Sequence, residues 1–260
     1  MLIFLQCLDN SGSNVVYDAA QPRLFFYYRL WTSARKSDNL KGMRDILKKH
    51  GALWSQKAFI AEVAIGLLFL GVALLGTYYA NSYTTAHASN FVTDLLLDNL
   101  PVVNVDFIFN EGALIFIIIL CGILLYEPNR IPFVLKSIAL FTAIRSGFMM
   151  LTHLAPPSYQ SYIDPADLLH RISSGNDLFF SAHTGLPFLL AFIFWDSKIF
   201  RCFFLFATVI GGVSVILGHL HYSIDVFSAL FISFGIFHIS KKLFGKDYQL
   251  FEESGPGSLS

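Results

Sequence analysis

Six apolar runs, separated by polar segments, dominate the sequence from residue 58 onward. A helix needs roughly 20 apolar residues to cross the ~30 Å hydrocarbon layer of a bilayer, and most of the runs approach that length. Inside a membrane each backbone polar group must be paired within the protein, so such runs fold as helices. The sequence therefore predicts an all-α membrane protein, a bundle of six transmembrane helices at residues 59–80, 113–126, 131–153, 178–195, 199–218 and 222–240.

The composition excludes other classes of protein. Hydrophobic residues make up 55% of the chain and charged residues 14%, whereas a soluble domain carries about 25% charged residues. The 18 Lys and Arg residues are balanced by 18 Asp and Glu residues, which argues against nucleic acid as a partner. Three widely spaced cysteines give no disulfide framework. The lipid bilayer is the predicted environment, and the sequence is compatible with a homo-oligomer.

Basic residues divide the chain into regions and predict its orientation. Residues 1–57 form a basic N-terminal region, residues 58–242 the membrane domain, and residues 243–260 a tail that we expect to be disordered. Fifteen Lys and Arg residues fall on the side of the termini and only Arg171 on the other side. Because cytoplasmic loops are enriched in Lys and Arg, both termini are predicted to be cytosolic. The opposite loops, at 81–112, 154–177 and 219–221, are predicted to be exoplasmic or lumenal.

Several charged residues lie inside the predicted spans, where burial of charge is costly. Glu62 and Lys136 lie near the cytosolic ends of their helices, and we expect both side chains to reach the membrane surface. Arg145 lies two turns inside the external end of the third span. A guanidinium at that depth needs an anion, which is either a carboxylate or a bound phosphate.

Two histidines and an aspartate are predicted in the same outer half of the bundle as Arg145. His183 lies at the external end of the fourth span, and His221 and Asp225 are four residues apart at the start of the sixth. On a helix that spacing places both side chains on one face, where the carboxylate can accept the imidazole N–H and leave the other nitrogen free. These four residues together suit phosphoryl transfer through histidine.

The motifs around these residues resemble the type 2 phosphatidic acid phosphatase superfamily, and more closely its sphingomyelin synthase branch. Residues 177–184, DLFFSAHT, and 219–226, HLHYSIDV, are similar to the two histidine motifs of that branch. Arg145 resembles the arginine of its third span. The segment DLLLDNLP, with Asp94 and Asp98, is similar to an acidic motif before its second span.

The resemblance implies a role for each of the four residues. His221 would be the nucleophile that forms a phospho-histidine intermediate, and Asp225 would orient it. His183 would be the general acid and base, and Arg145 would bind the phosphate. The resemblance implies no metal and no cofactor. Asp177, His219, Ser181 and Tyr222, within the same motifs, are candidates for supporting roles, and local loop hydrogen bonding is the alternative for them.

Two positions depart from the superfamily pattern. Ala182 replaces the usual glycine beside the histidine, and Val215 stands where the superfamily has an arginine. The synthase branch also lacks that arginine, so Val215 favours this branch over ordinary phosphatases.

The predicted function is a membrane-embedded, metal-independent phosphotransferase that resembles a sphingomyelin synthase. It would move a phospho-headgroup from a phospholipid donor to a lipid alcohol acceptor such as ceramide or diacylglycerol. The alternative is a lipid phosphate phosphatase or phospholipase C-like hydrolase that uses the same site with water as the acceptor. A non-enzymatic lipid or ion carrier is the third hypothesis, and the sequence shows none of the internal repeats typical of such carriers.

Overall fold

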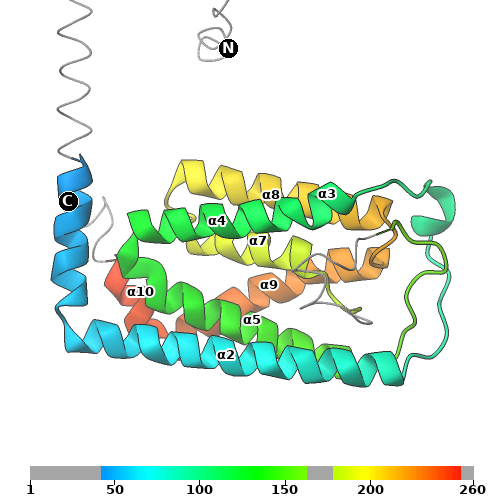
Figure 1. The fold of residues 1–260 in the computed structure, drawn as a ribbon, viewed down its shortest axis with the longest axis horizontal. Helices are drawn as coiled ribbons and strands as arrows, with labels where there is room; N and C mark the ends of the chain where they lie inside the picture. Colours follow the sequence, from blue (N-terminus) through cyan, green and yellow to red (C-terminus); the bar gives the residue numbers. More distant parts are fainter. Residues whose placement is uncertain (1–41, 163–177, 253–260) are drawn as a thin grey trace, which may run out of the picture. The chain divides into compact units, whose positions relative to one another are not determined.

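The protein is all-helical in the residues that the structure describes, 42–162 and 178–252 (Figure 1). This structure is a computed structural model. The chain divides into two units, residues 1–49 and 50–260. Of the first unit the structure describes residues 42–49, which are helical. The second unit contains the elements α2 (Lys57–Ala86), η2 (Leu97–Asn99), α3 (Asp106–Phe109), α4 (Glu111–Tyr126), η3 (Pro128–Arg130), α5 (Ile131–Leu151), α7 (Ala182–Ile193), α8 (Lys198–Leu217), α9 (Ser223–Leu243) and α10 (Gly245–Glu252).

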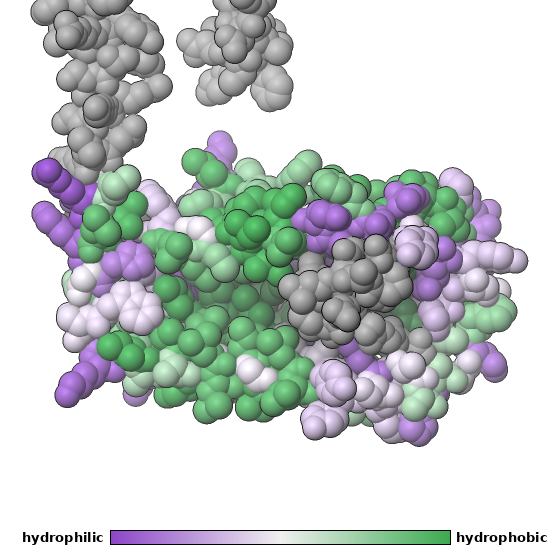
Figure 2. Space-filling view, in the orientation of Figure 1, coloured by the Kyte–Doolittle hydropathy of each residue, from purple (hydrophilic) through white to green (hydrophobic). Residues whose placement is uncertain are grey.

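Five segments among these elements are long and apolar enough to cross a membrane. They are α2, α3 with α4, η3 with α5, α8 and α9. Their outward surfaces carry many exposed leucine, isoleucine, valine and phenylalanine side chains, and Figure 2 shows apolar residues in the middle of the visible face with hydrophilic residues toward its two ends. Soluble proteins rarely expose an apolar surface of this extent to water. These five helices therefore indicate an integral membrane protein.

The fourth of the six predicted transmembrane helices is shorter in the structure than predicted. In place of a span over 178–195, α7 has 12 residues, a length of ~18 Å, well below the ~30 Å of the hydrocarbon layer. Seven of those residues are buried, because α8 and α9 pack against α7 on two sides (Figure 1). A helix enclosed by protein does not have to match the thickness of the bilayer, so α7 can be short.

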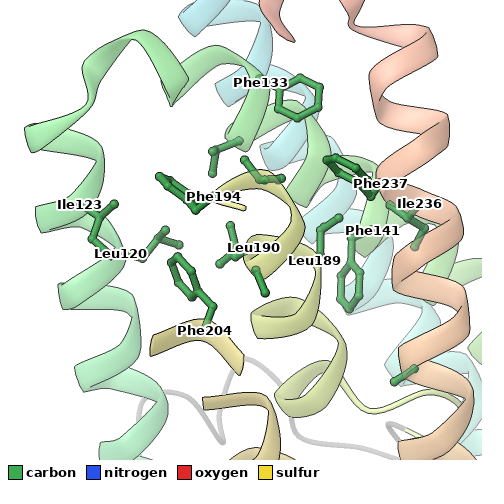
Figure 3. Packing of buried hydrophobic residues seen from close by; sticks show 14 of the residues in the cluster. Leu120, Ile123, Phe133, Phe141, Leu189, Leu190, Phe194, Phe204, Ile236 and Phe237 are labelled. Atoms are coloured by element: carbon green, nitrogen blue, oxygen red, sulfur yellow. The ribbon is translucent and has the colours of Figure 1, made fainter. Parts of the chain in front are cut away.

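The core around α7 is rich in phenylalanine. Phe194 and Phe204 have ring centroids 5.3 Å apart, and Phe141 meets Phe180 edge to face at the same distance. Figure 3 shows Leu190 of α7 with Phe194 and Phe204 on the side toward α4 and Phe141 on the other side. Aromatic pairs of this kind add stability beyond the area that they bury, which matters in a membrane because lipid gives no hydrophobic drive between helices.

Buried ion pairs lie at one end of the bundle, which we call the ion-pair end. Lys136 is 5% exposed and is paired with Glu62 and with Asp247 of α10, the latter at 2.6 Å. Arg130 is paired with Glu127, and its two terminal nitrogens donate hydrogen bonds to the two carboxylate oxygens of Asp196. The expectation that Lys136 reaches the membrane surface is therefore wrong.

The α10 helix corrects the prediction of a disordered tail over 243–260. Residues 245–252 are helical, and Asp247 is held by Lys136 while the Tyr248 ring packs against Phe133 at 5.2 Å. Residues 253–260 lie outside the described part of the chain.

Candidate active site

Three loops meet at the end of the bundle opposite the ion-pair end, and we call this the loop end. They are residues 87–105, 152–162 and 218–222. Backbone hydrogen bonds join the second loop to the first and to the third, from Ser89 N–H to the His153 carbonyl at 2.7 Å and from Ser161 N–H to the Gly218 carbonyl at 2.8 Å. The predicted outer loops thus share one end in their described parts, and the helices that carry the candidate residues begin or end there.

His221 and Asp225 form a buried pair at the loop end. The imidazole Nδ1 lies 3.2 Å from Asp225 Oδ2, and the two residues are 4% and 0% exposed. The predicted contact is present, but its local geometry differs from the prediction. The helix α9 begins at Ser223, so His221 lies in the preceding loop, and the chain brings it back toward the first turn.

Asp225 also organises the start of α9. Its Oδ2 accepts the N–H of Tyr222, the N-cap residue, at 3.2 Å, and its backbone carbonyl accepts the N–H of Ser181 at 3.0 Å. This second contact joins the start of α9 to the start of α7. Asp225 Oδ1 has no hydrogen-bond partner among the described residues. A buried carboxylate oxygen without a partner is costly and is typical of functional sites.

His183 is the second residue of α7, and its position depends on a proline and a glycine. Pro187 lies one turn later and has no N–H to donate to the His183 carbonyl. That carbonyl instead faces Gly211 of α8 so closely that a Cβ at Gly211 would lie 2.2 Å from it. The imidazole stacks on Phe109 of α3, with 4.2 Å between ring centroids.

Arg145 lies near these histidines and fixes the loop before α7. Its Nε donates to the Phe180 carbonyl at 2.9 Å, and its side chain is buried. Both Arg145 and His221 lie within electrostatic range of the His183 imidazole. Arg145, His183 and the His221–Asp225 pair are therefore brought together in one place.

The backbone is strained beside these residues. Among the described residues, three that are not glycine have positive φ: Phe179 at 82°, Phe180 at 31° and His219 at 52°. Such conformations are unfavourable for bulky side chains and persist where the surrounding structure imposes them. All three flank the candidate catalytic residues in the sequence.

Asp94 ties the first loop to the start of α9. Its Oδ2 accepts hydrogen bonds from the N–H and the hydroxyl of Ser223, at 2.7 and 2.8 Å, across 129 residues of sequence. Burial alone would raise the pKa of the Asp94 carboxyl, but these hydrogen bonds and two further backbone N–H groups outweigh it and lower the pKa below the ordinary value of 3.8. Asp98 is exposed and accepts the N–H of Asp94.

The supporting candidates differ in their contacts. The Tyr222 hydroxyl donates to the Ala155 carbonyl at 2.8 Å, so it holds two loops together. The Ser181 hydroxyl and His219 Nε2 are buried and have no hydrogen-bond partner in the described part of the chain. Asp177 lies outside the described residues.

Sequence reasoning missed Phe109 and Gly211 and gave Asp94 only by resemblance. The one local signal was the Gly211–Gly212 pair in an otherwise apolar span, because glycine there indicates close approach of another backbone. Within the two described ranges no group of three or more His, Cys, Asp and Glu side chains is arranged to hold a metal ion.

The structure thus places two histidines, a carboxylate and an arginine at one end of an apolar helical bundle. A comparison with protein families bears on their role. The family described as PAP2 superfamily, C-terminal, matches residues 174–242, which include His183, His221 and Asp225. The match supports membership of the PAP2 superfamily, whose members are phosphoric ester hydrolases or phosphotransferases. No curated protein and no solved structure matches the chain.

Proposed function

We propose that the protein is a phosphotransferase that moves the phospho-headgroup of a phospholipid onto a lipid alcohol such as ceramide or diacylglycerol. The observation that carries the proposal is the buried contact of His221 Nδ1 with Asp225 Oδ2. If Nδ1 carries the proton, Nε2 is left with its lone pair for attack on phosphorus, and the carboxylate stabilises the charge that develops on the ring.

The reaction has two displacement steps. In the first, His221 Nε2 forms a bond to phosphorus, the bond from phosphorus to the diacylglycerol oxygen breaks, and that oxygen takes a proton from His183. In the second, His183 takes the hydroxyl proton of the acceptor, the acceptor oxygen bonds to phosphorus, and the bond from phosphorus to nitrogen breaks. General acid and base catalysis of this kind contributes roughly 10²–10⁴ in rate.

Arg145 would bind the non-bridging phosphate oxygens. Its buried guanidinium lies within electrostatic range of His183, and the planar fork of arginine suits two oxygens of a phosphate. The rival role is purely structural, through the Phe180 carbonyl. Arg145→Lys keeps the charge without the fork, so we expect turnover to fall sharply with little loss of thermal stability. Equal losses of both would favour the structural role.

A hydrolase with water as the acceptor is the second candidate, because PAP2 family members include phosphoric ester hydrolases. Val215 favours the transferase. It is fully buried, and its carbonyl accepts the N–H groups of Leu220 and His221. The arginine that ordinary phosphatases carry at this position is therefore replaced by a side chain that offers phosphate no hydrogen bond.

The reaction is proposed to take place on the exoplasmic or lumenal side, because the loop end carries the segments that are poor in Lys and Arg. Ser158 is exposed in one of its loops. In a variant without the native cysteines, Ser158→Cys should react with an impermeant thiol reagent in intact cells. Labelling only after permeabilisation would reverse the orientation.

The test of the reaction is incubation of the purified full-length protein with a panel of phospholipids, with and without ceramide or diacylglycerol, followed by mass spectrometry. A transferase yields a new headgroup-bearing lipid only when the acceptor is present, and the His221→Ala variant yields none. Free phospho-headgroup or inorganic phosphate without an acceptor would establish the hydrolase. No turnover of any phospholipid would refute both.

A further inference from the structure

An apolar cavity of about 200 Å³ on the membrane-facing side of the bundle has His183 in its lining. It lies between α4, α7 and α8. Most of its walls are small or aliphatic residues, including Gly112 and Ala113 of α4 and Ala207 and Gly211 of α8. His183 and Ser214 are the polar residues of the lining.

The cavity exists because α4 stands away from its neighbours along its first turns. Only Leu120 and Ile123 of its 16 residues are buried, and both lie in its second half. Where α4 passes the start of α7, it presents glycine and alanine, which leave space that larger side chains would fill. Ile117 and Ile210 line the cavity and are both 41% exposed, so the space is continuous with the lipid-facing surface.

An apolar space open to the bilayer will be filled by hydrocarbon, because an empty cavity forfeits the contacts of its lining. Along α8 the lining runs from Ala207 to Ser214, a length of ~10 Å. The volume is below the ~300 Å³ of pockets that enclose whole small molecules. The cavity therefore suits a segment of one aliphatic chain, with the rest of the lipid outside it.

We propose that this cavity binds the proximal part of one hydrocarbon chain of the lipid alcohol, and so sets the oxygen of that lipid against His183. The inference rests on the proposed function, in which His183 gives a proton to the oxygen of the departing lipid alcohol and takes the hydroxyl proton of the acceptor. It assigns the site between α4, α7 and α8 to a lipid with a long aliphatic chain and predicts discrimination against short chains.

Two glycines of α4 provide a matched test. Gly112 lines the cavity, whereas Gly122 is exposed and has nothing within 4 Å of an added Cβ. Gly112→Leu should lower kcat/KM for a long-chain acceptor at least tenfold and leave a short-chain, water-soluble acceptor within twofold. Gly122→Leu should match the wild type with both acceptors. Ala207→Leu, from the α8 wall, should behave as Gly112→Leu does.

A binding measurement separates this inference from the proposed reaction. A diacylglycerol with a photoreactive group near the top of one chain should label peptides from α4, α7 and α8 in the purified wild type. Gly112→Leu should reduce that labelling, and Gly122→Leu should not. Such labelling without any turnover would refute the reaction and keep the site. Normal long-chain turnover by Gly112→Leu, or labelling confined to α2 and α5, would overturn the site.

Discussion

The two ends of the bundle differ in how their buried ionisable side chains are paired, although unpartnered polar atoms such as Asn129 Oδ1 also occur at the ion-pair end of the described chain. At the ion-pair end, Arg130 and Lys136 are each matched with two carboxylates. At the loop end, Asp225 Oδ1, His219 Nε2 and the Ser181 hydroxyl are buried without a partner in the described ranges, and the backbone is strained at three positions. Paired charges hold a fold together, whereas unpaired groups and strain cost stability and persist where a ligand or a reaction needs them.

This contrast predicts that the two ends respond differently to mutation. Substitutions at the ion-pair end should reduce stability and leave the chemistry of the folded fraction unchanged. Substitutions of the catalytic residues at the loop end should remove the chemistry at little cost in stability.

Asp225→Asn should reduce turnover by about 10³–10⁴, because the amide cannot hold the His221 tautomer or stabilise its charge. That loss corresponds to roughly 4–5.5 kcal/mol in the barrier. The apparent melting temperature should change little, since the amide oxygen can still accept the Tyr222 N–H. Turnover with the phospholipid panel and a thermal melt in detergent measure both effects. A variant that keeps more than a tenth of the activity would remove Asp225 from the mechanism.

Lys136→Met should destabilise the protein by about 3–5 kcal/mol, because it leaves the buried Asp247 carboxylate without its partner. For a chain of this size the melting temperature should fall on the order of 10 °C. Lys198→Met is the control, since Lys198 is exposed. Activity per folded molecule should remain that of the wild type. A loss of turnover without a loss of stability would contradict the proposed difference between the two ends.

Gly211→Ala should cost about 1–3 kcal/mol, the usual range for overpacking, since the added methyl group would lie 2.2 Å from the His183 carbonyl oxygen. Turnover should fall as well, because α7 must shift and carry His183 with it. Gly235→Ala in α9 is the matched control, with nothing within 4 Å of its Cβ. If the two alanine variants melt and react alike, α8 does not position His183.

Asp94→Asn should have the smallest effect, about 1 kcal/mol, since the amide keeps one acceptor oxygen for Ser223 but loses the charge. The lowered pKa of Asp94 means that its contribution is complete above about pH 4 and is lost as the pH falls through the folded-state pKa. The wild type should therefore lose more stability than the variant below about pH 4. Parallel melting curves from pH 6 to pH 3 would show that Asp94 does not hold the start of α9.

Local patterns in the sequence predicted the long helices and one contact at the loop end. Apolar runs located the five long helices, and the spacing of His221 and Asp225 predicted their contact. The resemblance to the sphingomyelin synthase branch goes beyond what the family match supports, and it remains part of the proposal.

The contacts that the sequence did not predict depend on tertiary structure. Lys136 and Asp247 are 111 residues apart, and Asp94 and Ser223 are 129 apart, so no periodicity could pair them. The short α7 also depends on its neighbours, because hydropathy cannot distinguish a helix enclosed by protein from one that faces lipid.

The proposed mechanism requires that His221 at the loop end carries the phospho-headgroup. The most direct measurement is to mix the purified protein with a phospholipid that is radiolabelled in its headgroup, quench within a turnover, and map the labelled peptide by mass spectrometry. We expect an acid-labile adduct on His221 that accumulates without an acceptor, disappears when diacylglycerol or ceramide is added, and is absent from His221→Ala. Product formation with no adduct on His221, or an adduct that persists in His221→Ala, would contradict it.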